Sequence, residues 1–257
     1  MKVLLLGDAH GHWDEVDDRL QSAGRRFGAR AGIQVGDLGI SRGTVRTFAR
    51  GRGRFALPLY VVDGNHDDHA YIGRAMRNGE RQRWTCEMNL YLQPRPSVVE
   101  LDGVKVGFLG GALHVARPQS HGLLSGAPNY VTQRHAIAAA QLFEQERPAL
   151  LVTHSCPSGI GIQMRGHPEL RWGVHEHIVG AGFDPGPAHD PGEPGLRILW
   201  ERMKHRPRWW IFGHFHELRR VVVGETEFVS MAVVAPEVAG RELCWDTDSM
   251  RLVGTDP

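Results

Sequence analysis

The chain has 257 residues, 41% of them hydrophobic, and its formal net charge is +1. This length allows a full hydrophobic core in one domain, and the near-neutral charge makes no global case for a nucleic-acid or membrane-surface partner. Its apolar runs fall short of the roughly 18 residues of a membrane span, and the N-terminus enters a strand pattern at once, so we expect a cytoplasmic protein.

The first third of the chain alternates between strand and helix patterns. An apolar run at 3–6 is followed by a helical stripe of apolar residues, with Asp14 expected to cap the helix: Val16, Leu20, Ala23 and Phe27. A second apolar run at 33–35 completes a βαβ unit, whose strands should be parallel and whose crossover should be right-handed. Further helices are predicted at 44–50 and 68–77, on either side of a strand at 59–62.

The stretch 78–96 has basic, aromatic and proline residues without a clear period. We expect it to be irregular, either one wall of a substrate cleft or an ordinary surface excursion. Two strand-like runs between 98 and 109 flank Asp102-Gly103, a pair that supplies the positive backbone angles of a tight turn. This hairpin is predicted to open a second, antiparallel sheet.

The second half of the chain returns to alternating elements. A helix at 132–146, ended by Pro148, precedes a strand at 150–152, and another helical stripe runs from Leu196 to Met203. Between them, residues 155–194 are rich in glycine and proline and are predicted to form a cap-like insertion that faces the substrate. Two final hairpins, at 218–234 and 242–253, are predicted to complete the second sheet, so that 1–257 form a single domain.

The cysteines predict no covalent framework. There are three, far apart and without a Cys-x-x-Cys pair: Cys86, Cys156 and Cys244. This disfavours a disulfide network and a structural zinc knuckle. Cys156 lies two positions after His154, and we expect it to be a buried, inert thiol.

Five of the apolar runs end in Asp, Asn or His residues. Loops at strand ends hold side chains rigidly within reach of a ligand, so strands that share a sheet edge could aim these residues at one point. The converging set is Asp8, His10, Asp37, Asn65, His154, His214 and His216. Each alone is more often a helix cap or a loop hydrogen-bonding group, but an ordered set argues for a common site.

The chemistry of this set predicts a metal centre. Carboxylate, imidazole and amide groups form a mixed oxygen and nitrogen donor set, which suits manganese, iron or zinc better than calcium. Seven candidates exceed the needs of one ion, so we predict two divalent metal ions, Mn²⁺ and/or Fe with Zn²⁺ as the alternative, about 3.5–4 Å apart. Asp37 is predicted to bridge them.

The order of these motifs resembles that of the calcineurin-like metallophosphoesterase superfamily. The matching stretches are Gly7-Asp8-Ala9-His10-Gly11, Gly36-Asp37, Gly64-Asn65-His66-Asp67, His154 and Gly213-His214-Phe215-His216. The resemblance implies an α/β fold, a four-layered α/β/β/α sandwich of two mixed β-sheets flanked by helices, as the strand pattern also suggests. It further implies that Asp8, His10 and His216 hold one metal ion. Asn65, His154 and His214 would hold the other.

The resemblance also implies that His66 binds the phosphate or acts as general acid above the metal ions. Relatives of the protein-phosphatase type carry an acidic residue three positions after the bridging Asp, where it orients this histidine. This chain has Ile40 there, so Asp67 or Asp68 would have to supply the missing carboxylate.

Substrate contacts are expected after the second sheet begins. Gly110-Gly111 should pass close to the metal site, as the corresponding residues do in the family. His114 and Arg117 follow and are predicted to contact the substrate or the metal ligands.

The predicted activity is metal-dependent hydrolysis of phosphate esters by in-line attack of a metal-bridging hydroxide, with Asp37 and His66 as catalytic residues. The motif forms resemble the phosphodiesterase and nuclease-like branches, so a diester or a nucleotide-type substrate, including nucleic acid, is expected. A phosphomonoesterase is the alternative among enzymes. A protein-binding scaffold is the alternative outside them, although burial of so many polar groups without metal would be costly.

Overall fold

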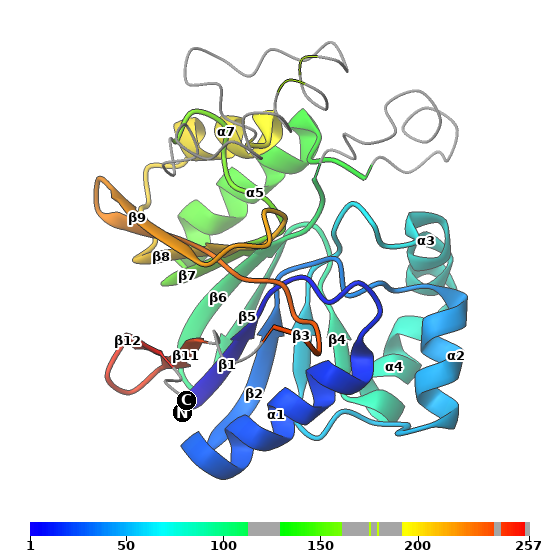
Figure 1. Cartoon of the computed structure of the whole chain (residues 1–257). Coiled ribbons are helices and arrows are strands. Elements are labelled where there is room, and N and C mark those ends of the chain that lie inside the picture. Colours follow the sequence, from blue (N-terminus) through cyan, green and yellow to red (C-terminus); the bar gives the residue numbers. More distant parts are fainter. Residues whose placement is uncertain (113–128, 161–174, 176–178, 180–191, 239–242, 255–257) are drawn as a thin grey trace.

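The computed structural model of the chain describes residues 1–112, 129–160, 175, 179, 192–238 and 243–254. Two six-stranded mixed sheets lie face to face, and helices cover their outer faces (Figure 1). The predicted α/β sandwich is therefore confirmed.

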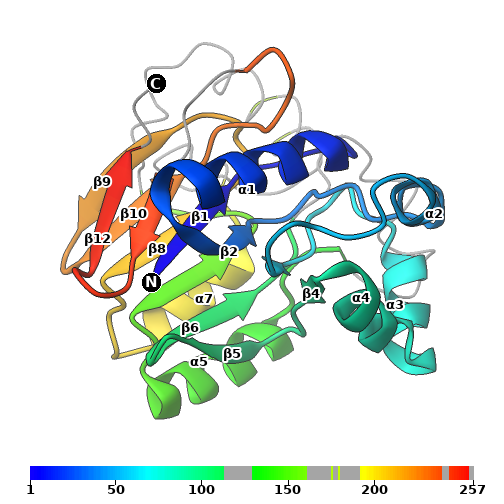
Figure 2. The ribbon, with the colours of Figure 1, turned by 90° about the horizontal axis from the view of Figure 1, so that it is seen from below.

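The first sheet contains the N-terminal part of the chain and its last hairpin. Its order is β12 (Arg251–Gly254), β11 (Leu243–Asp246), β1 (Lys2–Leu6), β2 (Ala29–Gln34), β3 (Leu59–Val61) and β4 (Leu90–Leu92). Strands β1 to β4 are parallel, whereas β11 and β12 form an antiparallel extension beyond β1. The helices between the parallel strands pack on the outer face, with α1 running across it (Figure 2): α1 (Trp13–Phe27), α2 (Arg42–Arg50), α3 (His69–Asn78) and α4 (Glu80–Met88).

The second sheet has a parallel centre and antiparallel edges. Its order is β5 (Ser97–Leu101), β6 (Val104–Leu109), β7 (Leu150–Thr153), β8 (Trp209–Phe212), β10 (Thr226–Ser230) and β9 (Arg219–Val223). Strands β6, β7, β8 and β10 are parallel, and β5 and β9 run against them. Helices α5 (Gln133–Glu146) and α7 (Pro194–Arg202) cover its outer face (Figure 1).

Strand β1 shows how the sequence builds the layers. Successive side chains of a strand point to opposite faces, so Leu4 and Leu6 join the core beneath the helices while Val3 and Leu5 join the core between the sheets. A third core lies between the second sheet and its helices, and it includes Trp210 and Phe212 from β8. Three cores separate the four predicted layers.

Most predicted elements are confirmed. The βαβ unit has parallel strands, and helices 44–50, 68–77 and 132–146 occur within two residues of their predicted ends. The hairpin between β5 and β6 turns at Asp102 and Gly103, with φ values of 53° and 79°. None of the three cysteines forms a disulfide, and Cys156 and Cys244 are buried. Among the described helices, none has the length and apolar character to cross a membrane.

The start of α1 differs from the prediction. The helix begins at Trp13, and its N-cap position is His12, which makes no side-chain cap bond. Trp13 is buried, and its indole N–H donates to the Leu38 carbonyl oxygen over 2.8 Å, which fixes the first turn two residues earlier than a cap at Asp14 would. Asp14 therefore lies inside the first turn, where its charge favours the positive end of the helix.

Most of the stretch 78–96 is regular, contrary to the prediction, although residues 93–96 have no helix or strand. It contains α4 and the short strand β4, joined to α3 through Gly79 in a left-handed conformation. Trp84 is buried, and its ring lies 5.6 Å from that of Tyr71 on α3. Helix α4 is thus part of the helical layer, because its aromatic residue packs inward instead of lining a cleft, and β4 adds the edge strand of the first sheet.

The last hairpin belongs to the first sheet, whereas the sequence predicts it in the second. Strands β9 and β10 do belong to the second sheet, but β11 pairs with β1 of the first sheet, from Lys2 opposite Asp246 to Leu5 opposite Leu243. The pattern of a hairpin does not say which sheet edge it joins. Here the free edge of β1 is covered by β11, and Trp245 is buried between the two sheets.

Candidate active site

The predicted polar residues lie where strands of both sheets end. From the first sheet come the residues after β1, β2 and β3: Asp8, His10, Asp37 and Asn65. From the second sheet come those after β7 and β8: His154, His214 and His216. The structure brings the two sets together, since His154 Nδ1 donates to the Val35 carbonyl oxygen over 2.9 Å and the His214 amide donates to Asp8 Oδ1 over 3.0 Å.

Asp8, His10 and His216 form one group. His216 Nε2 lies 3.2 Å from Asp8 Oδ2 and 2.9 Å from His10 Nε2, and His10 Nε2 lies 4.0 Å from Asp8 Oδ2. The three donor atoms lie within 4.8 Å of one another. Two imidazole nitrogens and a carboxylate oxygen so arranged suit a transition-metal ion.

Asp37, Asn65 and His154 form a second group. His154 Nε2 lies 3.3 Å from Asp37 Oδ2 and 3.0 Å from Asn65 Oδ1. Because Nδ1 of this ring donates to a backbone carbonyl, Nε2 is the nitrogen left to ligate a metal ion. Asp8, Asp37 and His154 also have donor atoms within 4.8 Å of one another, so Asp8 takes part in both groups.

His214 and His66 flank these groups. The ring of His214 meets that of His154 edge-on, with centroids 5.1 Å apart. The His66 amide donates to Asp37 Oδ1 over 2.7 Å, and the His66 ring lies edge-on to that of His10 at 5.4 Å. His66 is thus fixed to Asp37 through its backbone, while its exposed ring faces the first group.

The site has a buried side and an open side. Asp8 and His154 are 0% exposed and Asp37 is 1% exposed, whereas His10, His66 and His216 are exposed. A ligand would therefore approach over the histidines and meet the carboxylates beneath them.

Burial and charge shift the pKa values of the buried histidines in opposite directions. Burial disfavours a charged His154 ring, but the Asp37 and Asp8 carboxylates outweigh it and raise the pKa of His154 to about 10. Burial and then the charge on His154 lower the pKa of His214 to about 3. Burial alone would raise the pKa of Asp37, but His154 holds it well below its usual range. The pocket therefore stabilises positive charge beside Asp37.

The glycines that precede the predicted ligands are required by the side chains of predicted ligands from other loops. A Cβ on Gly36 would lie 2.5 Å from His154 Nδ1, one on Gly64 would lie 2.1 Å from Asp37 Oδ1, and one on Gly213 would lie 2.0 Å from Asp8 Oδ1. Distances this short are steric overlaps. The Gly-Asp, Gly-Asn and Gly-His pairs of the sequence are therefore packing requirements of one shared centre.

Four of the site residues have left-handed backbone conformations. The φ values are 43° for His10, 53° for Asp37, 71° for His214 and 60° for His216. Residues other than glycine rarely adopt these angles, and such strain persists only where the surroundings impose it. Here it follows from the tight turns that direct successive side chains of a loop to one point.

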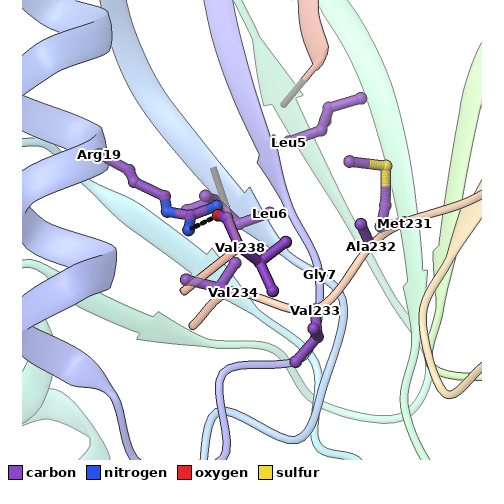
Figure 3. A pocket seen from close by; sticks show the side chains of 9 residues that line it. All are labelled: Leu5, Leu6, Gly7, Arg19, Met231, Ala232, Val233, Val234 and Val238. Atoms are coloured by element: carbon purple, nitrogen blue, oxygen red, sulfur yellow. Dashed lines mark hydrogen bonds between the residues drawn. The ribbon is translucent and has the colours of Figure 1, made fainter. Parts of the chain in front are cut away.

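A segment after β10 supports the first loop from behind. Figure 3 shows residues 231–234 passing beside Gly7, where a Cβ would lie 1.9 Å from the Ala232 carbonyl oxygen, and Arg19 of α1 donating to the Val238 carbonyl oxygen. The Val234 amide donates to the Asp8 carbonyl oxygen over 2.6 Å. The hollow between these residues has a volume of only about 10 Å³, room for one water, so it holds the loop and is too small for a substrate.

Two polar residues tie the ligand loops together in ways that the sequence analysis missed. The buried Gln34 side chain donates to the Gly7 carbonyl oxygen over 3.0 Å and accepts from the Gly36 amide over 3.0 Å, so it links the first two loops. The available signal was a polar residue in the middle of the apolar run 33–35. The Asp67 carboxylate accepts from the amides of Gly39, Ile40 and Gly64 and joins the second and third loops.

These contacts show whether Asp67 or Asp68 is available to replace the acidic residue that protein-phosphatase relatives carry at the position of Ile40. Ile40 is buried in the helix-side core. The oxygens of Asp67 serve the backbone amides named above, while Asp68 caps α3 by accepting from the Tyr71 amide over 2.9 Å. Both candidate carboxylates are thus engaged in loop and helix structure.

The remaining predictions concern Gly110-Gly111, the pair His114 and Arg117, and the insertion at 155–194. Gly110 does approach a carboxylate, but it is that of Asp63, whose Oδ1 would lie 2.1 Å from a Cβ. Asp63 is outside the ligand set. His114 and Arg117 lie outside the described residues, as does most of the 155–194 insertion.

The fold and the site together define a class of protein. Two mixed sheets present carboxylate, imidazole and amide donors at a common edge, and His154 Nε2, Asn65 Oδ1 and Asp37 Oδ2 converge within a few ångströms. This donor set fits a transition-metal ion. The class is that of the two-sheet metal-dependent hydrolases.

Comparison with known families identifies the family. The model of the calcineurin-like phosphoesterase family matches residues 1–218, and the chain belongs to this family. It is accordingly a metallophosphoesterase, a hydrolase of phosphate esters. No curated protein gives a significant match to the chain.

Solved structures share the fold at low sequence identity. The protein TT1561 of Thermus thermophilus is 13% identical with a TM-score of 0.60, over 98% of this chain and 96% of that one. A protein of Staphylococcus aureus provisionally assigned as a 5′-nucleotidase, solved with alpha-ketoglutarate, is 12% identical with a TM-score of 0.54, over 100% of this chain and 54% of that one. Identities this low establish the shared fold alone.

Proposed function

We propose that this chain hydrolyses phosphodiesters or nucleotide-type phosphate esters with a centre of two divalent metal ions. The observation that carries the proposal is the pair of donor groups that share Asp8, one with His10 and His216 and the other with Asp37 and His154. Two groups side by side fit two ions better than one. Mn²⁺ or Fe suits these donors best, with Zn²⁺ as the alternative.

Each residue has a distinct part in holding the ions. Asp8, His10 and His216 would hold one, and Asn65, His154 and His214 the other. Asp37 is proposed to lie between them, since its Oδ2 lies 3.3 Å from His154 Nε2 of the second group and its donor atom lies within 4.8 Å of that of Asp8 in the first. Such ions neutralise charge on the phosphoryl oxygens and lower the pKa of a bound water toward 7.

His66 is proposed to act on the leaving oxygen. Its ring is exposed above the first group, and its backbone is fixed through Asp37, so it can donate a hydrogen bond or a proton without holding a metal ion. Asp37 and His66 are thus the proposed catalytic residues.

The preference for diesters rests on the motifs. The motif Asn65-His66-Asp67 differs from that of the protein-phosphatase type. Ile40 also stands where that type has the acidic residue that orients the histidine corresponding to His66. Asp67 and Asp68 are engaged in other contacts, so a substrate with a better leaving group, such as an activated diester, would place less demand on His66.

The test compares a chromogenic phosphodiester with its monoester, using chelator-stripped protein with and without Mn²⁺. Turnover that needs Mn²⁺ and favours the diester is expected. Preference for the monoester would overturn the substrate proposal. Absence of metal binding and of hydrolysis with Mn²⁺, Fe²⁺ and Zn²⁺ would overturn the metal centre in favour of a scaffold.

A further inference from the structure

A buried ion-pair cluster lies beside the third ligand loop and outside the proposed ligand set. Asp63 follows strand β3 directly before Gly64 and Asn65, and its side chain is 8% exposed. Arg95 donates from Nε to Asp63 Oδ1 over 2.9 Å and from Nη2 to Asp63 Oδ2. This is a bidentate pair, the most directional form of an arginine–carboxylate contact.

His69 connects this pair to the ligand loop. It is the first residue of α3, and its Nε2 donates to the Gly64 carbonyl oxygen over 2.8 Å while its Nδ1 lies 3.3 Å from Asp63 Oδ2. The Gly64 carbonyl belongs to the peptide that leads into Asn65. A contact to that oxygen sets the rotation of this peptide and hence the direction of the Asn65 side chain.

The cluster also fixes the loop from the second sheet. The Gly111 amide donates to the Asp63 carbonyl oxygen over 2.7 Å, and a Cβ on Gly110 would overlap Asp63 Oδ1. Arg95 Nη1 also reaches the Tyr130 carbonyl oxygen at 3.4 Å. Asp63 is therefore held from three directions, by the segment before β5, by α3 and by the loop after β6.

We propose that Asp63, clamped by Arg95 and His69, is a positioning residue that orients the Gly64–Asn65 peptide and so builds the metal site to which Asn65 contributes. The inference rests on the proposed two-metal function. The inference predicts that metal binding at the site that includes Asn65 depends on Arg95, a residue from a separate part of the chain. Metal binding at the site of Asp8, His10 and His216 should not depend on it.

The experiment measures metal binding directly. Wild type, Asp63→Asn and His69→Phe are stripped with chelator and titrated with Mn²⁺ well below their unfolding temperatures, with bound Mn²⁺ counted by elemental analysis after dialysis. Electron paramagnetic resonance then distinguishes a spin-coupled Mn²⁺ pair from single ions. Asp63→Asn keeps the size and an acceptor oxygen, so it remains informative if His69→Phe does not fold.

A matched control comes from a second buried carboxylate that pairs with an arginine. Asp17 on α1 is 2% exposed, pairs with Arg52 over 3.0 Å and accepts from the Ala56 amide. These partners lie between α2 and β3, away from the ligand loops. Asp17→Asn should therefore destabilise the fold yet leave two coupled Mn²⁺ ions.

We expect wild type and Asp17→Asn to bind two spin-coupled Mn²⁺ ions. Both cluster variants, Asp63→Asn and His69→Phe, should bind one ion tightly and the second at least tenfold more weakly, and the signal of the coupled pair should be lost. If the cluster variants bind two coupled ions with wild-type affinity, Asp63 is merely structural and the inference is overturned. If wild type itself binds no Mn²⁺, the proposed metal centre fails first, and the inference fails with it.

Discussion

At the scale of single residues, two buried side chains of the site, His154 and Asp37, are each oriented by a hydrogen bond on one atom that leaves another atom facing the centre. His154 gives its Nδ1 to the Val35 carbonyl oxygen, and Asp37 gives its Oδ1 to the His66 amide. These bonds remove rotational freedom before any ligand arrives, which is the condition for a preorganised site. A substitution that keeps the orienting hydrogen bond but removes the reactive side chain should therefore lower turnover without changing metal binding.

His66→Ala should make that separation. The alanine amide can still donate to Asp37, so metal content should stay at the wild-type value, while loss of the ring should lower kcat by roughly 10²–10⁴-fold for a substrate with a poor leaving group. Elemental analysis and steady-state kinetics on the same preparation give both values. A variant with the full wild-type rate would show that His66 is not the acid.

Gly213→Ala should disable the site through sterics. The new Cβ would lie 2.0 Å from Asp8 Oδ1 and 2.7 Å from Val35 Cγ2, so the carboxylate must move. We expect loss of metal from the group of Asp8 and activity reduced at least tenfold. Gly43→Ala in helix α2 is the control, because its Cβ would lie 3.6 Å from the nearest atom; it should keep activity and add about 0.5–1 kcal/mol of stability. Equal metal content in both variants would contradict the packing argument.

At the scale of elements, helix α4 illustrates a segment whose role is structural. The composition of its stretch is compatible with a cleft wall or with a surface excursion, yet Trp84 is 4% exposed and Met88 is buried with it in the helix-side core. The exposed face carries an ion pair between Arg83 and Glu87, at 3.4 Å, one turn apart. A helix of this kind contributes stability and no chemistry.

Trp84→Ala should therefore separate stability from function. Removing a buried tryptophan should lower the free energy of unfolding by about 3–5 kcal/mol, while metal content and kcat at low temperature stay close to wild type. Urea denaturation monitored by circular dichroism measures the loss. Arg83→Ala on the exposed face of the same helix should change stability by no more than about 0.5 kcal/mol; a loss of metal in Trp84→Ala would show that α4 supports the site.

At the scale of the whole molecule, the candidate centre draws its donors from both sheets. Asp8, Asp37 and Asn65 belong to loops of the first sheet, while His154 and His214 belong to the second. Any ion bound between them links two sheets that also share a hydrophobic core. Metal binding should therefore act on the stability of the entire fold.

Chelator treatment should lower the unfolding temperature of the wild-type protein. A ligand that binds the folded state at 100 times its Kd adds about 2.7 kcal/mol, which corresponds to a shift of roughly 5–10 °C for a chain of this length. Differential scanning calorimetry with Mn²⁺, with Ca²⁺ and with chelator measures it. Ca²⁺ should stabilise less, because it prefers oxygen donors. Equal effects of Ca²⁺ and Mn²⁺, or none from either, would contradict the nitrogen-rich centre.

The sequence by itself determined the order of the motifs, the family they belong to, the alternation of strands and helices, and the turn at Asp102 and Gly103. These are local properties: the period of apolar residues reports which faces are buried, and short motifs report which chemistry the strand ends carry. It could not assign the β11–β12 hairpin to the first sheet, since a strand pattern contains no information about its partner.

Only the tertiary structure decided which residues support the ligands. Gln34, Asp63, Asp67 and Arg95 act on loops that are distant in sequence, and Gly36, Gly64 and Gly213 make room for side chains from other motifs. Those contacts exist because two sheets pack face to face and bring separate strand ends to one place. Short-range sequence patterns do not predict these contacts. The contacts depend on the steric and hydrogen-bonding fit between segments that meet only in the folded chain.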